Sequence, residues 1–523
     1  MDNQDKRFLN LCVSEIKNSK IFNSYNCEFP LDNEVIEILS SLNEKLESSG
    51  DDYEIFRYKK NIDNLWGTLL EKSIKCLRYY DSREPFLNSE FNKKSPKAYG
   101  INDLKSYYEK YSEFEKVLYG TSRYYRDHII HVFRTWLIGI WLLTNNKGEY
   151  LNQISIPEKG FTVKLNNAEK VSIWTIIALT HDLGYPLEKA KDVIDITQKM
   201  ISTFISNPDI SSDLSFHGVQ NYMNDFIVRL MSSKMKIKKT IDLSGEKNEE
   251  NEKDKKIEFV ARLQPKYYFK FQKSLEKNSH GILSTIIIYK LLTYFLESDY
   301  NINEDYTFEE EDCRQFYIRR EILRSIASHT CDDVYQLYIG SFALLLRICD
   351  DTQEWGRKNI SELYVKTNQT YELKDIIIDI DSEEKTKTCT IKEEIEISSA
   401  YATESVFNLI KRYREQSLVY ITIFRDGQDT AKRDFSFIKN LLIKFNQVEI
   451  KLVLSIPNGA SSSLKGEINY TSISETNKEF APEKFECLPL QSKVELRGEN
   501  SKFVNEQDAG KWRKGSFELS LID

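Results

Sequence analysis

An apolar run from Val171 to Leu183 constrains this chain more than any other stretch. Its content of Ile, Leu and Trp predicts a buried helix, which Gly184 and Pro186 would close as C-terminal cap and stop. The run ends in His181-Asp182, so an imidazole and a carboxylate are expected at the buried end of a core helix. A buried carboxylate is costly unless it is paired or coordinates a metal. A polar pair that merely closes the helix is the plainer interpretation, and the other histidines decide between the two.

The length and charge of the chain bound its class. Its 523 residues exceed what one core usually holds, which predicts two or three domains. The formal net charge is -8, whereas a protein that binds duplex nucleic acid usually presents a basic face. A stable duplex partner is therefore disfavoured. A small phosphorylated substrate is compatible with this charge if metal ions supply the positive charge.

Cysteine usage and hydropathy indicate the compartment. The eight cysteines are scattered without a CxxC pair, which is typical of free thiols in a reducing compartment. The first residues lack the apolar core of a signal peptide. The longest apolar stretch, Val132 to Leu143, is interrupted by Arg134 and is too short to span a bilayer. We expect a cytoplasmic protein without a membrane partner.

Hydrophobic periodicity predicts a mainly α protein with a smaller α+β domain at its C-terminus. Residues 1–119 read as a helical cap, residues 120–360 as a helical domain and residues 361–523 as an α+β domain of unknown role. The Lys, Glu, Asn and Asp of residues 232–258 predict a solvated, mobile loop within the helical domain. In the α+β domain, strands are expected at 363–366, 375–381, 388–397, 418–424, 448–456 and 466–472, and helices at 405–416 and 435–445.

Histidine is scarce, and its distribution points to a metal centre. All six histidines fall within the expected helical domain, several of them at one end of an apolar helix. Two metal ions could find nitrogen and oxygen ligands in one ordered set, with Asp182 as a bridge. Imidazole with carboxylate suits Mn, Fe, Zn or Ni. The candidate ligands are His131, His181, Asp182, His280, His329 and Asp350.

The order H…HD…H…H…D, with the last Asp in a Leu-Leu-Arg-Ile-Cys-Asp-Asp run, resembles the HD-domain superfamily of metal-dependent phosphohydrolases. The resemblance covers roughly residues 120–360. It implies a helical HD-type domain in which His131, His181, Asp182 and Asp350 hold the first metal. It also implies that His280 and His329 correspond to the extra histidines of the dinuclear members.

Two ligand assignments have alternatives. His128 precedes His131 by three residues, and we prefer His131 because Arg134 then repeats the family's His-x-x-Arg pattern. His217 and His280 are both followed by Gly, and we prefer His280 because it opens a long apolar helix. His217 lies in a polar stretch, where a surface histidine is the more common case.

The expected reaction is attack of a metal-activated hydroxide on the phosphorus of a nucleotide or a nucleotide-like phosphoester. His128 or Lys189 could protonate the leaving oxygen. Trp355 could stack on a base, although a Trp there is more often core. Four arginines could bind phosphate, with a surface salt bridge as the plain alternative for each: Arg134, Arg126, Arg347 and Arg357.

The residues leave other functions open. A scaffold that binds a nucleotide without catalysis and signals to the C-terminal domain is one alternative. A di-iron oxygenase is another, because the ligand set also resembles the oxygenase that cleaves inositol, and ligands alone do not fix a reaction. The bond cleaved, the base, the sugar and the oligomeric state, a homo-oligomer included, are not determined by the sequence.

Overall fold

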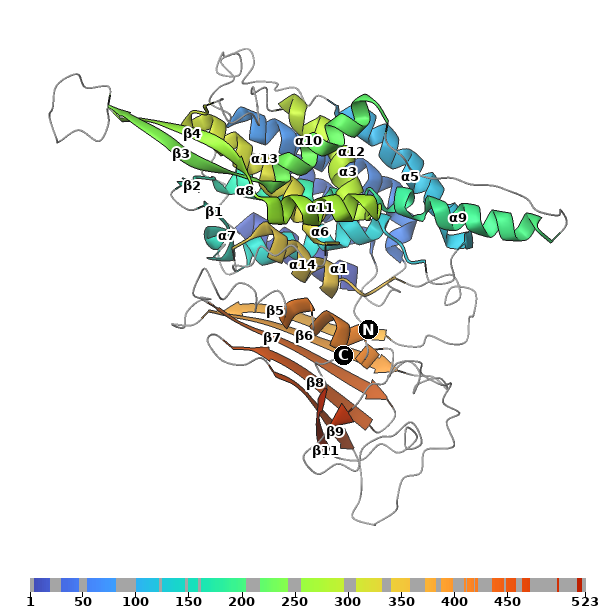
Figure 1. The fold of residues 1–523 in the computed structure, drawn as a ribbon. Helices are drawn as coiled ribbons and strands as arrows, with labels where there is room; N and C mark the ends of the chain where they lie inside the picture. Colours follow the sequence, from blue (N-terminus) through green and yellow to red (C-terminus); the bar gives the residue numbers. More distant parts are fainter. Residues whose placement is uncertain are drawn as a thin grey trace, which may run out of the picture. The chain divides into compact units, whose positions relative to one another are not determined.

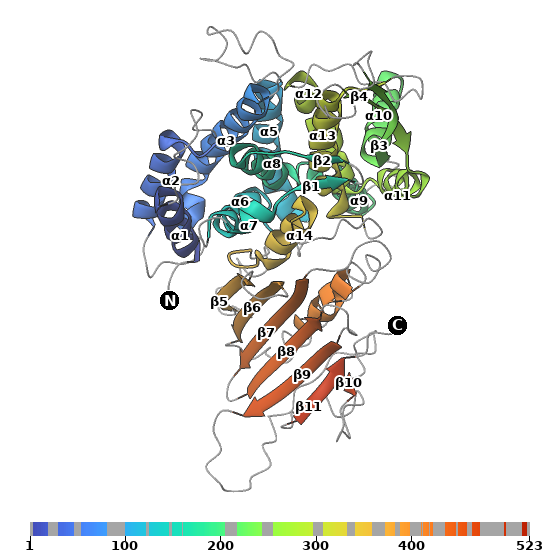
Figure 2. The same ribbon diagram turned by 90° about the vertical axis from the view of Figure 1, so that its left-hand side faces the viewer.

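The computed structural model divides into two compact units, one within residues 2–353 and one within residues 354–523. The chain is mainly helical, with a sheet-containing region near its C-terminus (Figures 1 and 2). The structure describes residues 4–18, 30–46, 54–80, 100–121, 125–145, 149–158, 161–203, 217–242, 255–295, 307–331, 340–357, 372–381, 387–397, 409–410, 412–417, 419–421, 435–445, 448–457, 463–470, 496–497 and 515–519.

Two buried helices, α6 (Ile129–Thr144) and α8 (Asn167–Thr180), lie in the middle of the helical unit (Figure 1). Gly139 of α6 faces the ring of Trp174 so closely that a Cβ there would lie 2.0 Å from it. The Trp136 indole donates a hydrogen bond of 3.0 Å to the Thr175 hydroxyl. The helices therefore need a small residue at their crossing, which explains a glycine inside an otherwise bulky apolar run.

The N-terminal helices belong to the same compact unit and pack on its two central helices. Helix α1 packs on α6, and α3 packs on α8 through a 2.8 Å hydrogen bond from the Trp66 indole to the Leu179 carbonyl. Cys12 lies against α6, where its thiol donates to the Leu137 carbonyl. These elements are α1 (Gln4–Asn18), α2 (Asn33–Lys45), the 3-10 helix η1 (Glu54–Tyr58), α3 (Lys59–Tyr79) and α5 (Ile101–Thr121).

The rest of the helical unit surrounds this core. None of the described helices is both long enough and apolar enough to cross a membrane. The short elements after α6 are α7 (Glu149–Gln153), β1 (Ile156–Glu158) and β2 (Phe161–Val163). The helices after α8 are α9 (Tyr185–Ile201), α10 (Val219–Ser232), α11 (Pro265–Glu276), α12 (His280–Phe295), α13 (Glu310–Ser328) and α14 (Phe342–Thr352).

The loop expected over residues 232–258 is corrected at both of its ends. Strands β3 (Ser233–Asp242) and β4 (Lys255–Leu263) pair as an antiparallel ribbon, drawn as a long hairpin in Figure 1. Its base is anchored by apolar residues, because Met235, Phe259 and Val260 are buried. Residues 243–254 lie outside the described part. The alternation of apolar and charged side chains in these two segments indicates strands, and it is a better guide here than overall charge.

The C-terminal unit contains a seven-stranded sheet within its described residues, in the order β10-β11-β9-β8-β7-β6-β5. Neighbouring strands pair antiparallel except β6 and β7, which are parallel. Figure 2 shows the twist of the sheet. The strands are β5 (Glu372–Asp381), β6 (Lys387–Ile397), β7 (Phe435–Phe445), β8 (Val448–Ile456), β9 (Ser463–Tyr470), β10 (Leu496–Arg497) and β11 (Gly515–Leu519).

Two expectations for this unit are wrong. The helix expected at 435–445 is the inner strand β7, whose Phe437, Leu441 and Ile443 are buried on one face. The strand expected at 418–424 is helical over residues 419–421. Residues 412–417 are also helical, and Tyr413 among them donates its hydroxyl to the Lys439 carbonyl of β7. The strand expected at 363–366 lies outside the described residues.

Candidate metal centre

Two buried carboxylates fix the N-terminus of α6 and thereby the position of His131. Asp127 accepts hydrogen bonds from the backbone N–H groups of Ile130 (2.9 Å) and His131 (3.0 Å). Glu115 accepts from the backbone N–H of His128 at 2.9 Å. Negative charge at a helix N-terminus is favourable. The helix begins at Ile129, and Asp127 lies just before it with its carboxylate against the first-turn N–H groups.

The His181-Asp182 pair occupies the turn between α8 and α9, where Gly184 allows close approach of α12. A Cβ on Gly184 would lie 2.3 Å from the backbone oxygen of His280. Ser284 of α12 donates to the His181 carbonyl (2.6 Å) and accepts from the Gly184 N–H (2.8 Å). These two bonds hold α12, which begins with His280, against the turn.

The six candidate ligands come together around Asp182. Its Oδ2 lies 3.4 Å from Nε2 of His181 and 3.8 Å from Nε2 of His131. Its Oδ1 lies 3.4 Å from Nε2 of His280 and 3.5 Å from Nε2 of His329. The Asp182 carboxylate therefore stands between two pairs of imidazoles.

Asp350 completes the first of these pairs. Its Oδ1 lies 2.9 Å from Nε2 of His131 and 3.8 Å from Nε2 of His181. The side chains of Asp350 and His280 keep 21% and 20% of their surface exposed, whereas those of His131, His181 and Asp182 are almost fully buried. Within the described residues, two groups have ligand atoms close enough to hold a metal ion: His131, His181 and Asp350, and His181, Asp182 and His329.

The four imidazole rings of the centre each turn their other nitrogen, Nδ1, toward an oxygen. A carbonyl or carboxylate oxygen only accepts, so Nδ1 carries a hydrogen, and in the neutral ring Nε2 presents its lone pair to the centre. This arrangement is the usual outer support of metal-bound histidines. The Nδ1 acceptors are Gln353 Oε1 for His131 (2.6 Å), the Ala178 carbonyl for His181 (2.8 Å), Glu188 Oε2 for His280 (2.7 Å) and the Ile326 carbonyl for His329.

The centre consequently gathers acceptors that only a cation can satisfy. The Nε2 atoms of His280 and His329 lie 3.2 Å apart, although both rings carry their hydrogen on Nδ1. Nε2 of His181 is buried and has no hydrogen-bond partner in the described part of the chain. Buried acceptors without donors are unfavourable unless a proton or a metal ion lies among them. The donor set fits divalent metals that accept nitrogen and oxygen ligands.

The ionisation of the centre agrees with this geometry. Burial alone would raise the pKa of Asp182, but His181 and the neighbouring imidazoles outweigh it and hold this pKa well below its usual range. The pKa of Asp350 is likewise lowered against the effect of burial, chiefly by its hydrogen bond with His131. Burial disfavours a proton on His181, yet Asp182 and Asp350 raise its pKa to about 9, so a proton lies among these acceptors when no other cation binds them. Both carboxylates are therefore ionised and attract a cation.

No protein-family model, curated protein or solved structure matches this chain. The interpretation of the centre therefore depends on its own geometry.

Arg134 was expected to bind substrate, and the structure gives it another partner. Its guanidinium donates two hydrogen bonds of 2.7 Å to the two oxygens of Asp5 in α1. Neither side chain has exposed surface. The expectation for Arg134 is therefore corrected: the guanidinium ties α1 to α6 one turn after His131.

The two candidate proton donors lie beside the centre. His128 stacks on Tyr185 with ring centroids 3.8 Å apart, and its centroid is 6.3 Å from that of His131. Lys189 lies 3.6 Å from Glu188 and 3.5 Å from Asp192, with a third of its side chain exposed. His217, the alternative to His280, is exposed at the start of α10 and belongs to neither ligand group found among the described residues.

The remaining expected substrate contacts divide between the two units. Arg347 of α14 donates to Asp351 (2.8 Å) and to the His329 carbonyl (3.0 Å), so it supports the ligand-bearing turn. Arg126 is half-buried just before α6. Trp355 and Arg357 belong to the C-terminal unit, and Trp355 is buried, which favours the core interpretation for its ring.

Sequence reasoning missed the outer residues Glu188, Gln353 and Glu115. Glu188 adjoins Lys189, which was singled out, and Gln353 follows Asp350 by three residues. A search for side-chain acceptors within one helical turn of the expected ligands would have found Gln353 but not Glu188, which lies six residues after Asp182. Glu115 precedes His128 by thirteen residues and carried no signal of its own.

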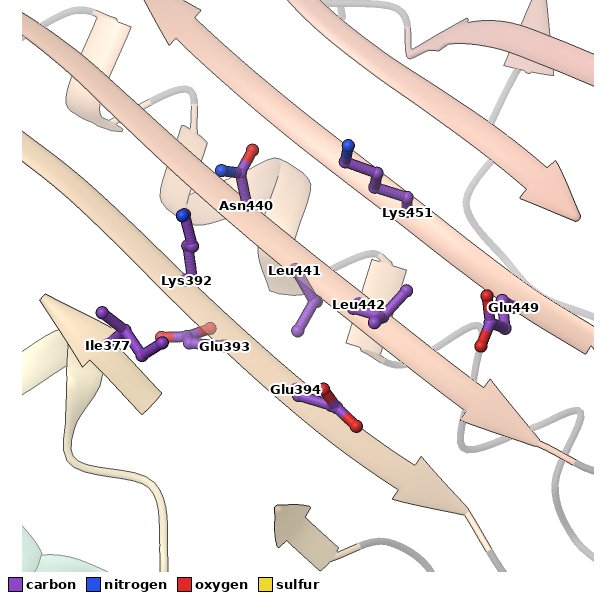
Figure 3. A pocket seen from close by; sticks show the side chains of 9 residues that line it. All are labelled: Ile377, Lys392, Glu393, Glu394, Asn440, Leu441, Leu442, Glu449 and Lys451. Atoms are coloured by element: carbon purple, nitrogen blue, oxygen red, sulfur yellow. The ribbon is translucent and has the colours of Figure 1, made fainter. Parts of the chain in front are cut away.

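The sheet has a hollow of about 470 Å³ across β5 to β8 (Figure 3). Register places Lys392, Asn440 and Lys451 on one face together with Glu394 and Glu449. Figure 3 shows these side chains standing apart along the strands. Positive and negative side chains that do not converge on one point are typical of a solvent-exposed sheet face, so we assign no ligand to this hollow.

Proposed function

We propose that this protein is a metal-dependent phosphohydrolase of the HD type that acts on a nucleotide or a nucleotide-like phosphoester. One observation carries the proposal: four imidazole Nε2 atoms converge on two ionised carboxylates, while the Nδ1 atom of each ring faces an oxygen outside the centre. A binding scaffold without metal would have no use for such a set of buried acceptors. The order of the ligands along the chain, H…HD…H…H…D, adds the resemblance to phosphohydrolases.

The residues could form two metal positions. His131, His181, Asp182 and Asp350 would hold the first ion, and His280 and His329 would add ligands for a second ion beside Asp182. Two divalent ions of Mn, Fe, Zn or Ni there would supply a nucleophilic water of lowered pKa and neutralise phosphate oxygens. Ligands on α6, α8, α12, α13 and α14 are fixed by the buried bonds described above, so they are preorganised.

His128 is the better candidate for protonating the leaving oxygen. It is buried at 7% exposure, and its stacking on Tyr185 fixes the ring. Lys189 is less firmly positioned, because its ion pairs with Glu188 (3.6 Å) and Asp192 (3.5 Å) are long and a third of its side chain is exposed. A proton passed from His128 to the leaving oxygen would release the product as a neutral hydroxyl.

The test is release of phosphate and nucleoside from deoxynucleoside triphosphates, monophosphates and cyclic or linear dinucleotides, with Mn²⁺ added. Asp182→Ala should abolish turnover by removing the shared ligand. Asp195→Ala is the matched control, because this exposed carboxylate on α9 lies away from the ligand set. Turnover of one substrate class, lost only in Asp182→Ala, is the expected result.

Other outcomes would favour the alternatives. Nucleotide affinity that survives chelation, without turnover, would indicate a binding scaffold. Oxygen consumption that requires iron would indicate a di-iron oxygenase, whereas full activity with Mn²⁺ under anaerobic conditions would eliminate that reading.

A further inference from the structure

The four histidines of the centre differ in what supports them. His181 and His329 donate from Nδ1 to carbonyls three residues earlier in the chain, and His280 donates to the carboxylate of Glu188. These oxygens can only accept a hydrogen bond, so the tautomer of each ring is fixed. His131 instead donates to the side-chain amide of Gln353, which has both an acceptor and a donor end.

Gln353 is built into the same turn as the ligand Asp350. It follows α14 directly, its N–H bonds to the carbonyls of Cys349 (3.2 Å) and Asp350 (3.3 Å), and it is fully buried. This turn contacts both ring nitrogens of His131. Gln353 Oε1 lies 2.6 Å from Nδ1, and Asp350 Oδ1 lies 2.9 Å from Nε2. A shift of the turn would move both contacts together.

The orientation of the Gln353 amide decides whether His131 is a ligand. With its oxygen toward Nδ1, the hydrogen stays on Nδ1 and Nε2 is free to bind a metal. With the amide reversed, its NH₂ would donate to Nδ1 and the hydrogen would move to Nε2, within reach of Asp350. The ring would then be a hydrogen-bond donor to the centre and could not bind a metal.

The chain passes from the helical unit to the C-terminal unit at the peptide bond between Gln353 and Glu354. Glu354 is held within the second unit by a bidentate ion pair with Arg412, including a bond of 2.7 Å from Nη1 to Oε2. The neighbouring Tyr413 bonds the sheet, because its hydroxyl accepts from the Leu454 N–H at 2.9 Å. The residue next to Gln353 is thus anchored to the sheet.

We propose that Gln353 is a positioning residue through which the C-terminal unit sets the metal affinity of His131. When Arg412 holds Glu354, the turn presents the Gln353 oxygen to His131 and the first metal position is complete. When this ion pair is released, the turn is free to shift or the amide to reverse, and affinity at that position falls. The inference rests on the proposed metal centre but not on the reaction that the centre catalyses.

The first test is a titration of the whole metal-free protein with Mn²⁺. Calorimetry and the electron paramagnetic resonance signal of free Mn²⁺ measure the affinity and the number of bound ions. Gln353→Leu should weaken one of two binding events by roughly 10 to 100 fold, as for other lost outer-sphere partners. Gln353→Glu should restore it, because a carboxylate accepts from Nδ1 as Glu188 does. Gln220→Leu, on the surface of α10, is the control.

The second test is a double-mutant cycle across the unit boundary. Arg412→Gln should weaken the same binding event by roughly fivefold or more, a typical coupling between sites. It should add nothing in the Gln353→Leu background. Lys444→Gln, which breaks the separate 2.7 Å pair with Glu394 in the sheet, should leave Mn²⁺ affinity unchanged.

The outcomes separate this inference from the proposed function. If the wild-type protein binds no Mn²⁺, the metal centre itself is refuted and the inference with it. If it binds two ions but Gln353→Leu binds them equally well, only the positioning role is refuted. Equal affinities of Arg412→Gln and wild type, or additive losses in the double variant, would refute the coupling to the C-terminal unit.

Discussion

At the scale of single residues, Asp5 and Arg134 form a fully buried ion pair in the helical unit. Two parallel hydrogen bonds of 2.7 Å join side chains that have no exposed surface. Breaking such a pair leaves one buried charge without its partner, which typically destabilises by about 3–5 kcal/mol. Replacing both partners by apolar residues removes both charges and costs much less.

We therefore expect Asp5→Leu and Arg134→Met each to lower the free energy of unfolding by about 3–5 kcal/mol, measured by urea denaturation. The double variant should be more stable than either single one. A substrate-binding Arg134 would behave differently: Arg134→Met would raise KM and leave stability nearly unchanged.

At the scale of elements, the approach of α12 to the end of α13 depends on Gly281. A Cβ there would lie 2.4 Å from the Thr330 hydroxyl and 2.9 Å from the Ile326 carbonyl. Gly281→Ala should therefore push the helices apart, widen the 3.2 Å gap between His280 and His329, and destabilise by about 1–3 kcal/mol. Mn²⁺ stoichiometry should fall from two ions to one.

Gly120→Ala provides the control for this substitution. Gly120 lies near the end of α5, and a Cβ there would meet nothing within 4 Å. Alanine is favoured over glycine in a helix, so stability should rise by up to about 1 kcal/mol with metal content unchanged. Two tightly bound ions in Gly281→Ala would mean that α12 can withdraw without cost to the centre.

The elements also show what a sequence can and cannot indicate. The candidate ligands could be selected from the sequence because histidines are scarce and stand at the ends of apolar helices, where the short-range pattern is informative. Their supports are remote: Gln353 is 222 residues from His131, and Asp5 is 129 from Arg134. A local pattern can mark Gln353 as a candidate beside Asp350, but it does not indicate that Gln353 supports His131. Strand β7 was misread for a related reason, because its apolar residues also fit a helical period and its neighbours in the sheet decided between the two.

At the scale of the whole molecule, all candidate metal ligands belong to one of the two units. Ions bound there would hold together the ends of α6, α8, α12, α13 and α14 and relieve the repulsion among buried acceptors. A ligand that binds only the folded state stabilises by RT ln(1 + [L]/Kd), about 2.7 kcal/mol at a hundredfold excess over Kd. Chelation should therefore weaken the helical unit most.

Differential scanning calorimetry with Mn²⁺ and with a chelator tests this expectation. The transition of the helical unit should rise by roughly 5 °C with Mn²⁺, and Asp182→Asn should remove the shift. Because linkage is reciprocal, coupling through Gln353 requires a smaller shift of the sheet unit as well, and Arg412→Gln should abolish that smaller shift alone. Identical scans with and without Mn²⁺ would show that the convergent acceptors do not bind metal in the folded protein. A metal-dependent sheet transition that persists in Arg412→Gln would show that the units communicate by another route.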